Sequence, residues 1–307
     1  MAFEQAIVSF AMVRTLESTH HCLLDASPRL ESSEAVRSFE LTPEQVASFH
    51  ENGYVAGLKI LEPSQLEESR RRLDSIRTRL MEVEPLLHEV EAEYLHRPDE
   101  VVLHFLGAWR IDEWFHDLVF SPRVTVPLAQ CLTVRRLRFW HDQVFYKPPR
   151  HPGVVPWHQD YSYWTRATPA GHITLNLVLD DTDLRNGCLH FIPGSHRWGL
   201  FPKVGFGGDM DQILQHLPET QRRKFRPVPV PLKAGEASIH HSHTIHGSFS
   251  NFSARPRRAV VLNYMNAETR CGDGHSPLLR GVPLIPEDAR IEGDFFPIAL
   301  DLDSLSP

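Results

Sequence analysis

The stretch Trp157-His-Gln-Asp-Tyr161 is the most informative part of this 307-residue sequence, because it places a histidine and a carboxylate two positions apart. On a β-strand, residues i and i+2 point to the same face, so His158 and Asp160 can bind one ion while Gln159 points away. Two imidazoles and one carboxylate form a facial ligand set for Fe(II) that leaves the opposite coordination positions open. The pair therefore predicts part of an iron site that needs a second histidine.

The second histidine comes from residues 237–251. This segment carries four histidines, His240, His241, His243 and His246. If the segment is one strand, side-chain alternation places His240 and His246 on the same face, so the alternation alone does not show which of the two is the ligand. We choose His246 because Gly247 permits a close backbone approach and Ser248 supplies a hydroxyl two positions further on. The other three histidines are expected on the surface or behind the metal ligands.

Arg257 follows the second histidine and completes the pattern. Pro256 has no amide hydrogen to donate, so we expect a strand to begin at Arg257, which places its guanidinium at the mouth of the strand. A guanidinium there can bind a carboxylate through two parallel hydrogen bonds, which lysine cannot reproduce. The alternative is a solvated basic cluster with Arg255 and Arg258. Together with the histidines and the carboxylate, the first interpretation predicts an oxygenase.

Length and composition agree with a single globular enzyme. Hydrophobic residues make up 41% of the chain, and the formal net charge of −7 gives no broad attraction to nucleic acid or to an anionic membrane. The cysteines are widely spaced and form no Cys-x-x-Cys pair: Cys22, Cys131, Cys188 and Cys271. Such spacing predicts reduced thiols in an intracellular compartment, where Fe(II) also persists.

The two ends of the sequence were compared with signals that direct proteins to membranes or to the peroxisome. The apolar run at residues 6–13 is too short to span a bilayer, so we expect a helix or a disordered lead. The last residues, Ser-Leu-Ser-Pro, differ from the Ser-Lys-Leu peroxisomal signal. We therefore expect a cytoplasmic location in preference to a peroxisomal one. We expect a small-molecule substrate, no nucleic-acid partner and no membrane insertion, and the oligomeric state stays open.

The first third of the chain predicts helices. Thr42 and Pro43 have the N-cap and first-turn chemistry of a helix that ends near Asn52-Gly53. A second helix is expected over residues 64–81, where leucine and isoleucine recur at helical spacing. The charge-rich residues 82–100 are expected to be a solvated surface segment, to extend that helix or to cover the site as a lid.

From Leu132 onward, short alternating runs separated by Pro and Gly predict strands. Residues 174–179 alternate well, and Asn186-Gly187 leads into a second predicted strand at residues 188–192. A mainly β, α+β architecture with peripheral helices fits this pattern, in the form of a double-stranded β-helix, or cupin-like jelly roll. Such a fold brings distant parts of the sequence together around one site.

Taken together, these residues resemble the phytanoyl-CoA dioxygenase family of Fe(II)- and 2-oxoglutarate-dependent oxygenases over roughly residues 40–268. The matching stretches are Trp157-His-Gln-Asp-Tyr161, Leu179-Asp-Asp-Thr182, Asn186-Gly-Cys-Leu189, Pro193-Gly-Ser-His196 and His246-Gly-Ser248, followed by Asn251 and Arg257. The resemblance divides the chain into an N-terminal extension at residues 1–39 and a dioxygenase domain at residues 40–307.

The resemblance also implies roles for individual residues. The implied iron ligands are His158, Asp160 and His246. Arg257, with Ser248 beside it, matches the arginine that binds the distal carboxylate of 2-oxoglutarate. Gln143 and Asn176 occupy positions similar to further cosubstrate contacts, although many relatives carry a bulky aromatic residue near Asn176. His104 could match an upstream contact, but a histidine in such an apolar segment is more often part of a helix or a core.

The implied activity is hydroxylation of an unactivated C–H bond in a small organic or lipid-like substrate, with Fe(II) as the cofactor and with 2-oxoglutarate and O₂ consumed to give succinate and CO₂. Aromatic residues near the site are candidates for its substrate wall: Tyr161, Tyr163, Trp164, Trp198 and Phe201. A CoA thioester, a fatty-acid derivative and a secondary metabolite all remain open as substrates. The alternatives are a non-catalytic 2-oxoglutarate and metal-binding protein, a zinc hydrolase and an iron halogenase. Asp160 argues against the halogenase, which needs that ligand position for chloride.

Overall fold

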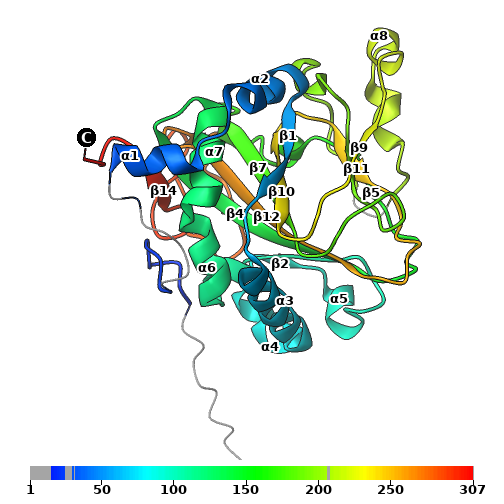
Figure 1. Ribbon diagram of the computed structural model, residues 1–307, viewed down its shortest axis with the longest axis horizontal. Coiled ribbons are helices and arrows are strands. Elements are labelled where there is room, and N and C mark those ends of the chain that lie inside the picture. The colour runs from blue at the N-terminus through cyan, green and yellow to red at the C-terminus, as the bar shows by residue number, and fades with distance from the viewer. Residues whose placement is uncertain (1–14, 25–29, 31, 206–207, 307) are drawn as a thin grey trace, which may run out of the picture.

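The computed structural model describes residues 15–24, 30, 32–205 and 208–306. The apolar run at residues 6–13, expected to form a helix or a disordered lead, lies outside the described residues. The described part of the chain is built around two antiparallel sheets, with helices packed outside them (Figure 1).

The larger sheet has eight strands and forms the backbone of the fold. Its order is β1 (Tyr54–Lys59), β10 (Glu236–His241), β7 (His172–Val178), β12 (Arg257–Asn266), β4 (Arg136–Lys147), β3 (Leu103–Leu106) and β2 (Glu89–Val90), with β14 (Ile298–Asp301) also paired to β4. Each pair is antiparallel, and neighbours in the sheet are far apart in the sequence.

The smaller sheet has four strands, in the order β5 (Val155–His158), β11 (His246–Ser248), β8 (Leu189–Phe191) and β9 (Val228–Val230). A separate pair joins β6 (Ala167–Thr168) to β13 (Arg270–Cys271). One cavity is lined by residues of both main sheets, so the sheets face each other across it. This confirms the predicted jelly roll.

Strand β7 shows how the sequence pattern fixes the two faces of the large sheet. Ile173, Leu175 and Leu177 are fully buried in the main hydrophobic core. The residues between them, Thr174 and Asn176, line the cavity on the opposite face. Because side chains alternate along a strand, one strand supplies both the core and the site.

Strand β12 repeats this division. Val260, Leu262 and Tyr264 belong to the core, while Arg257 and Val261 line the cavity. The strand begins at Arg257, directly after Pro256, as the missing amide hydrogen of proline predicts.

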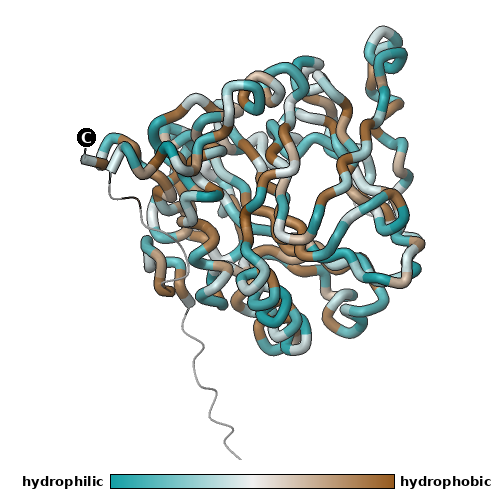
Figure 2. The backbone as a smooth tube through the Cα atoms, viewed as in Figure 1, coloured by the Kyte–Doolittle hydropathy of each residue, from teal (hydrophilic) through white to brown (hydrophobic). Residues whose placement is uncertain are grey.

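Helices α6 (Glu113–Phe120) and α7 (Pro122–Leu132) cover the core face of the large sheet (Figure 1). They bury Phe115 and Val124 against strand residues such as Phe139 and Leu262. Figure 2 shows hydrophobic residues concentrated along the central strands, whereas the outer helix α3 (Pro63–Thr78) is largely hydrophilic. Burial of this apolar surface is the main stabilising contribution to the fold.

The two predicted helices are present. Helix α2 (Pro43–Asn52) has a capping box between Thr42 and Gln45, and it ends at Gly53, whose φ of 83° suits a residue without a Cβ. The predicted helix over residues 64–81 is α3, which ends at Thr78 and is followed by α4 (Leu80–Val83).

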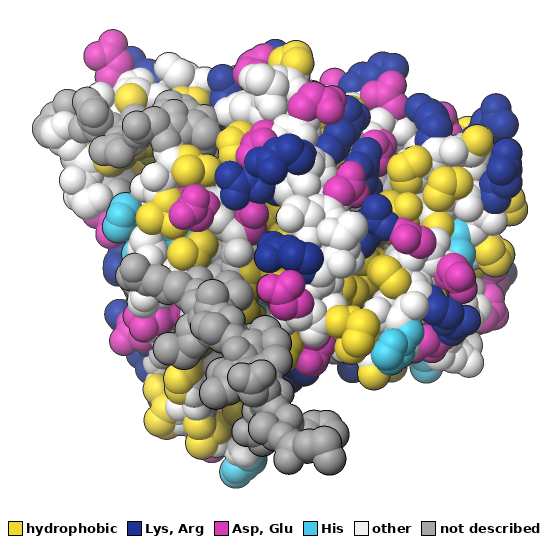
Figure 3. Space-filling model, turned by 90° about the horizontal axis from the view of Figure 1, so that it is seen from below, with side chains coloured by type: hydrophobic (Ala, Val, Ile, Leu, Met, Phe, Trp, Pro, Cys, Tyr) yellow, Lys and Arg dark blue, Asp and Glu magenta, His cyan; other side chains and the backbone are white. Residues whose placement is uncertain are grey.

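Ion pairs follow the exposed side of α3. Glu68 contacts Arg71, three residues on, at 2.5 Å and Arg72, four residues on, at 2.7 Å. Arg70 likewise contacts Glu67, three residues before it. Figure 3 shows basic and acidic side chains interspersed over the face of the molecule seen from below. Among the described residues of that face, neither charge sign therefore forms an extended region.

The charge-rich residues 82–100 do not continue the helix, so that expectation was wrong. They form η2 (Glu84–Leu86), strand β2 and α5 (Ala92–His96). Pairing of β2 with β3 recruits the segment to the edge of the large sheet. As a result, Glu89 and Glu91 line the cavity.

The remaining short helices are α1 (Ser33–Val36), α8 (Glu219–Arg222), η1 (Arg37–Phe39), η3 (Ala108–Arg110), η4 (Asp160–Tyr163), η5 (Ser195–Arg197) and η6 (Gln212–His216). The described residues between 15 and 39 contact the rest of the chain. The backbone amides of Leu23 and Leu24 donate to the Asp117 carboxylate at 2.7 and 2.6 Å. The backbone amide of Ser33 donates to the Ser306 carbonyl oxygen at 2.9 Å. None of the helices within the described ranges has the length and apolar character needed to cross a membrane.

Candidate active site

Three side chains from the predicted pattern meet at one end of the small sheet. His158 ends β5, His246 begins β11, and the two are direct cross-strand partners. Asp160 begins η4, just beyond β5. The Asp160 Oδ1 atom lies 3.4 Å from His158 Nε2 and 3.6 Å from His246 Nε2, and all three donor atoms lie within 4.8 Å of one another.

These separations fit a metal ion. An ion about 2.1 Å from three mutually adjacent donors places them roughly 3 Å apart, and the two distances from Asp160 Oδ1, 3.4 and 3.6 Å, are close to this value. The residues also match the two-histidine, one-carboxylate set that suits Fe(II) and leaves coordination positions open toward the cavity.

Hydrogen bonds fix the tautomer of both histidines. His158 Nδ1 lies 2.8 Å from the Pro156 carbonyl oxygen, and His246 Nδ1 lies 2.9 Å from that of Thr244. A carbonyl oxygen only accepts, so each Nδ1 carries the proton and donates it. Each Nε2 atom therefore carries a lone pair that can bind a metal.

Asp160 is held just as firmly. Its Oδ2 atom accepts hydrogen bonds from Thr174 Oγ1 at 2.7 Å and from His240 Nε2 at 3.0 Å, which leaves Oδ1 for the metal. Burial by itself would raise the pKa of Asp160, but His246, His158 and His240 together hold that pKa well below its usual range. The carboxylate is ionised at neutral pH, as metal binding requires.

Residues 237–251 do not form the single strand assumed from the sequence. Strand β10 ends at His241 in the large sheet, and β11 begins at His246 in the small one. The chain thus crosses from one sheet to the other, and this crossing brings His240 behind the carboxylate of Asp160. His243 instead stacks on Tyr161, with ring centroids 5.1 Å apart.

We expect the supporting residues of Asp160 to tune metal affinity. Removing an outer partner of a metal ligand typically lowers affinity about 10- to 100-fold. His240→Leu and Thr174→Val should therefore weaken metal binding in this range, because each removes one hydrogen bond to Oδ2 and keeps all three ligands. Anaerobic titration with Fe(II) measures the change, and His243→Leu is the matched control. Equal affinities in all four proteins would show that these hydrogen bonds do not matter for the metal.

Arg257 lines the same cavity and is 2% exposed. Its Nε atom has no hydrogen-bond partner, and no Asp or Glu of the described chain forms an ion pair with it. Burial lowers the pKa of Arg257 to about 10, so the guanidinium stays charged at neutral pH. A buried, unpaired cation is costly, which indicates a site for an anionic ligand.

The neighbouring arginines behave differently, so the alternative of one solvated basic cluster was wrong. Arg255 pairs with Asp183 at 2.9 Å on the surface, and Arg258 pairs with Asp180 at 2.8 Å. Strand alternation separates Arg258 from Arg257, which alone of the three lines the cavity.

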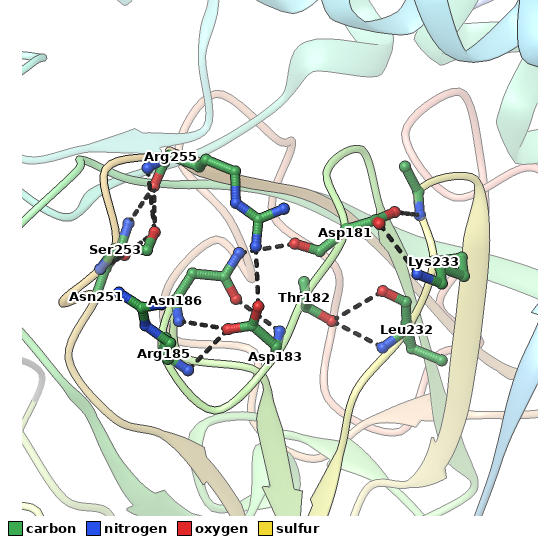
Figure 4. A network of polar contacts seen from close by, with 11 residues as sticks. Asp181, Thr182, Asp183, Arg185, Asn186, Leu232, Lys233, Asn251, Ser253 and Arg255 are labelled. Atoms are coloured by element: carbon green, nitrogen blue, oxygen red, sulfur yellow. Dashed lines mark hydrogen bonds and ion pairs between the residues drawn. The ribbon is translucent and has the colours of Figure 1, made fainter.

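A polar network fixes the loop that precedes Arg257 (Figure 4). The Asn251 side chain donates to the Arg255 carbonyl at 2.7 Å and accepts from the Ser253 hydroxyl at 2.8 Å. Arg255 is itself tied to Asp183, whose amide donates to Asn186 Oδ1 at 2.7 Å. The polar residues at 181–186 and 251–255 therefore bond the two loops to each other. These bonds hold the chain in place directly before β12 begins.

The other candidate residues lie around the cavity. Gln143 on β4 and Asn176 on β7 both line it, as does His104 on β3. His104 is thus a strand residue at the cavity wall, and the expectation of a helix or core position was wrong. Its Nε2 lies 3.3 Å from Gln143 Oε1, and burial lowers the pKa of His104 to about 4, so the ring is neutral at neutral pH.

The cavity has a volume of about 480 Å³. Its lining includes the aromatic residues Trp140, Tyr163 and Trp164, and Leu278 and Leu279 pack in the same hydrophobic cluster and also line the cavity. Of the aromatic residues expected here, Tyr161, Trp198 and Phe201 pack in hydrophobic clusters and do not line this cavity.

The chain therefore combines a jelly roll with a facial metal triad and a buried cation at one cavity, which defines the class of non-haem iron oxygenases that use a carboxylate cosubstrate. Within this class, the sequence model of the family described as phytanoyl-CoA dioxygenase (PhyH) matches residues 49–259. The chain belongs to this family and is an Fe(II)- and 2-oxoglutarate-dependent dioxygenase.

Individual relatives agree with this placement. A phytanoyl-CoA dioxygenase of Arabidopsis thaliana is 25% identical over 258 residues, which cover 74% of this chain and 90% of the relative. A probable alpha-ketoglutarate-dependent hypophosphite dioxygenase of Stutzerimonas stutzeri is 29% identical over 161 residues, which cover 49% and 52% of the two chains. The epimerase SnoN, solved with Fe3+, alpha ketoglutarate and nogalamycin RO, shares the fold with a TM-score of 0.63 at 19% identity, covering 87% of this chain and 99% of that one.

Proposed function

We propose that this dioxygenase hydroxylates an unactivated C–H bond of a small organic or lipid-like substrate and releases succinate and CO₂. The observation that carries the proposal is the intact triad of two histidines and an ionised carboxylate at the wall of a cavity that is also lined by aromatic and aliphatic residues. Bound Fe(II) supplies the activation of O₂, coupled to decarboxylation of 2-oxoglutarate.

In this proposal, His158, Asp160 and His246 hold the iron. The hydrogen bonds to Pro156 and Thr244 fix the two imidazoles, and His240 with Thr174 fixes the carboxylate. The protein therefore presents the three donors in place before the metal arrives, which lowers the cost of ordering them on binding.

The cosubstrate lies toward β12 in this proposal. Arg257 and Ser248 bind its C5 carboxylate, since both line the cavity and the guanidinium has no protein carboxylate as a partner. Gln143 and Asn176 project from adjacent parts of the large sheet and offer amide groups to the remainder of the molecule.

The substrate then lies against the apolar part of the cavity wall, which Trp140, Tyr163, Trp164, Leu278 and Leu279 form together. At the surface end of the cavity the exposed side chains are Glu89, Glu91 and Lys203. Two carboxylates against one ammonium would repel the phosphates of a CoA thioester. This charge pattern favours an uncharged organic substrate, held mainly by apolar and aromatic contacts.

Two alternative functions, an iron halogenase and a non-catalytic binder, differ from hydroxylation in the products that they would give. A halogenase leaves a ligand position free for chloride, whereas Asp160 projects its Oδ1 between both Nε2 atoms, which supports hydroxylation. A non-catalytic binder would retain 2-oxoglutarate without turning it over.

The experiment is anaerobic reconstitution with Fe(II), followed by measurement of succinate release on exposure to O₂ across a panel of uncharged metabolites, fatty acids and CoA thioesters. We expect slow release without substrate and faster release with at least one uncharged metabolite. No succinate from protein with verified iron content, under every condition, would favour the non-catalytic binder. A zinc hydrolase would ignore 2-oxoglutarate altogether.

We also propose that residues 40–307 act as one dioxygenase unit in the cytoplasm, without a nucleic-acid partner. The four cysteines all lie in the described part of the chain and none of them is in a disulfide there, which supports a reducing compartment. Three of them, Cys131, Cys188 and Cys271, are buried. They are therefore protected from oxidants in solution.

A further inference from the structure

Lys147, the last residue of β4, is fully buried, with no exposed surface. Complete burial is rare for lysine, since removing an ammonium from water is costly unless it is well bonded. Its Nζ atom donates hydrogen bonds to Ser248 Oγ at 2.9 Å and to the Phe249 carbonyl oxygen at 2.5 Å. The ammonium is therefore fixed in place by two consecutive residues just beyond His246.

Lys147 is also the direct cross-strand partner of Arg257 in the pairing of β4 with β12. Alternation along β4 places Lys147 on the same face as Gln143, which lines the cavity. In the described chain, neither cation forms an ion pair with an Asp or Glu. Asp180, the carboxylate whose charge reaches Arg257, is already bonded to Arg258 at 2.8 Å.

Two buried cations side by side repel each other, and burial together with Arg257 holds the pKa of Lys147 well below its usual range. The charged form of Lys147 is therefore disfavoured in the ligand-free protein. An anionic ligand at Arg257 would lower the cost, because its negative charge would attract both cations.

The surrounding backbone is shaped to admit the ammonium. Gly187 has a φ of 78°, and a Cβ added there would collide with the Phe249 carbonyl oxygen and lie 3.3 Å from Lys147 Nζ. The Asn186-Gly187 pair thus does more than turn the chain into β8. It lets the backbone close over Lys147 and exclude water from it.

We propose that Lys147 is a positioning residue for the C5 carboxylate of 2-oxoglutarate, acting through Ser248 and in concert with the charge of Arg257. By donating to Ser248 Oγ, the ammonium occupies a lone pair of that oxygen. The single hydroxyl proton of Ser248 is then directed to the carboxylate that Arg257 binds. The inference rests on the proposed placement of the cosubstrate, and it adds a second cation to that placement.

The test compares two 2-oxo acids that differ only at the distal end. 2-Oxopentanoate has the same keto-acid head as 2-oxoglutarate but a methyl group in place of the C5 carboxylate. Lys147→Met removes the charge and keeps the aliphatic bulk. We expect this variant to bind 2-oxoglutarate roughly tenfold to a hundredfold more weakly than wild type, while 2-oxopentanoate affinity and iron content stay nearly unchanged. Anaerobic calorimetry on the Fe(II)-loaded protein measures the two affinities, and metal analysis of the same protein gives the iron content.

Two further variants make the result decisive. Lys147→Gln keeps a hydrogen-bond donor without the charge, so it tests the same loss if the methionine variant fails to fold. Lys233→Met is the matched control, because Lys233 is an exposed lysine whose ion pair with Asp181, at 3.2 Å, lies away from the cavity.

The outcomes separate this inference from the proposed function. Equal loss of affinity for both 2-oxo acids would make Lys147 a merely structural residue and overturn the inference. So would unchanged 2-oxoglutarate binding in both Lys147 variants, provided that wild type binds it and Arg257→Lys weakens it. If wild type bound no 2-oxoglutarate at all, the proposed cosubstrate site itself would be wrong, and this inference would fall with it.

Discussion

Replacement of any one of His158, Asp160 or His246 by alanine is expected to abolish tight Fe(II) binding and turnover. The site has only three protein donors, and their Nε2 and Oδ1 atoms all lie within 4.8 Å of one another. Loss of one leaves two ligands, too few to hold the ion against water. Iron content after anaerobic reconstitution, together with 2-oxoglutarate-dependent succinate release, measures both effects.

His243→Ala is the control for this series, because His243 stacks on Tyr161 and has no hydrogen bond to Asp160 in the structure. It should keep its iron and most of its activity. The ligand assignment would be wrong if His246→Ala kept normal iron content while His240→Ala lost it. His240 bonds to Asp160 Oδ2, so its own substitution should weaken binding without eliminating it.

Arg257→Lys is expected to raise the 2-oxoglutarate requirement roughly tenfold to a hundredfold, with iron affinity largely retained. The charge stays, but the planar pair of donors that matches a carboxylate is lost. A charge-assisted hydrogen bond contributes about 1.5 to 3 kcal/mol, which corresponds to this range. Titration of 2-oxoglutarate at saturating Fe(II) gives the half-saturation concentration directly.

Arg255→Lys is the matched control for Arg257, since Arg255 is an exposed arginine whose guanidinium bonds to Asp183. Its half-saturation should equal that of wild type. If Arg257→Lys also left the value unchanged, Arg257 would have no part in cosubstrate binding.

Much of this architecture could be predicted from local sequence. The Thr42 cap and Gly53 define α2 because capping depends on neighbouring residues only. Alternation along β7 likewise separates Leu175 from Thr174, since the two faces of a strand follow from its period of two. The pairing of His158 with Asp160 is local in the same sense, and the structure places both beside His246.

Other features could not be predicted, because they depend on contacts between distant segments. The crossing from β10 to β11 depends on which sheet each strand joins, and no local signal separates His241 from His246 in this respect. Trp198 and Phe201 pack away from the cavity for a similar reason, since an aromatic residue near a motif can face either the core or the site.

The burial of Lys147 is the clearest example of a feature that local sequence does not predict. In the sequence it precedes Pro148 and resembles a surface lysine at the end of a strand. Its burial follows from pairing with Arg257 and from the approach of Gly187, which are both remote along the chain. Only the tertiary structure brings these residues together.

The most direct test of the account is the fate of O₂ in a reaction with a substrate found in the metabolite screen. Wild-type protein with Fe(II), 2-oxoglutarate and ¹⁸O₂, in the presence of excess chloride, is predicted to place one ¹⁸O atom in succinate and one in a hydroxylated product, as measured by mass spectrometry. Asp160 occupies the position that chloride would need, so no chlorinated product is expected. A chlorinated product without ¹⁸O, or labelled succinate with no oxygen added to any substrate that accelerates its release, would contradict the assignment as a hydroxylase.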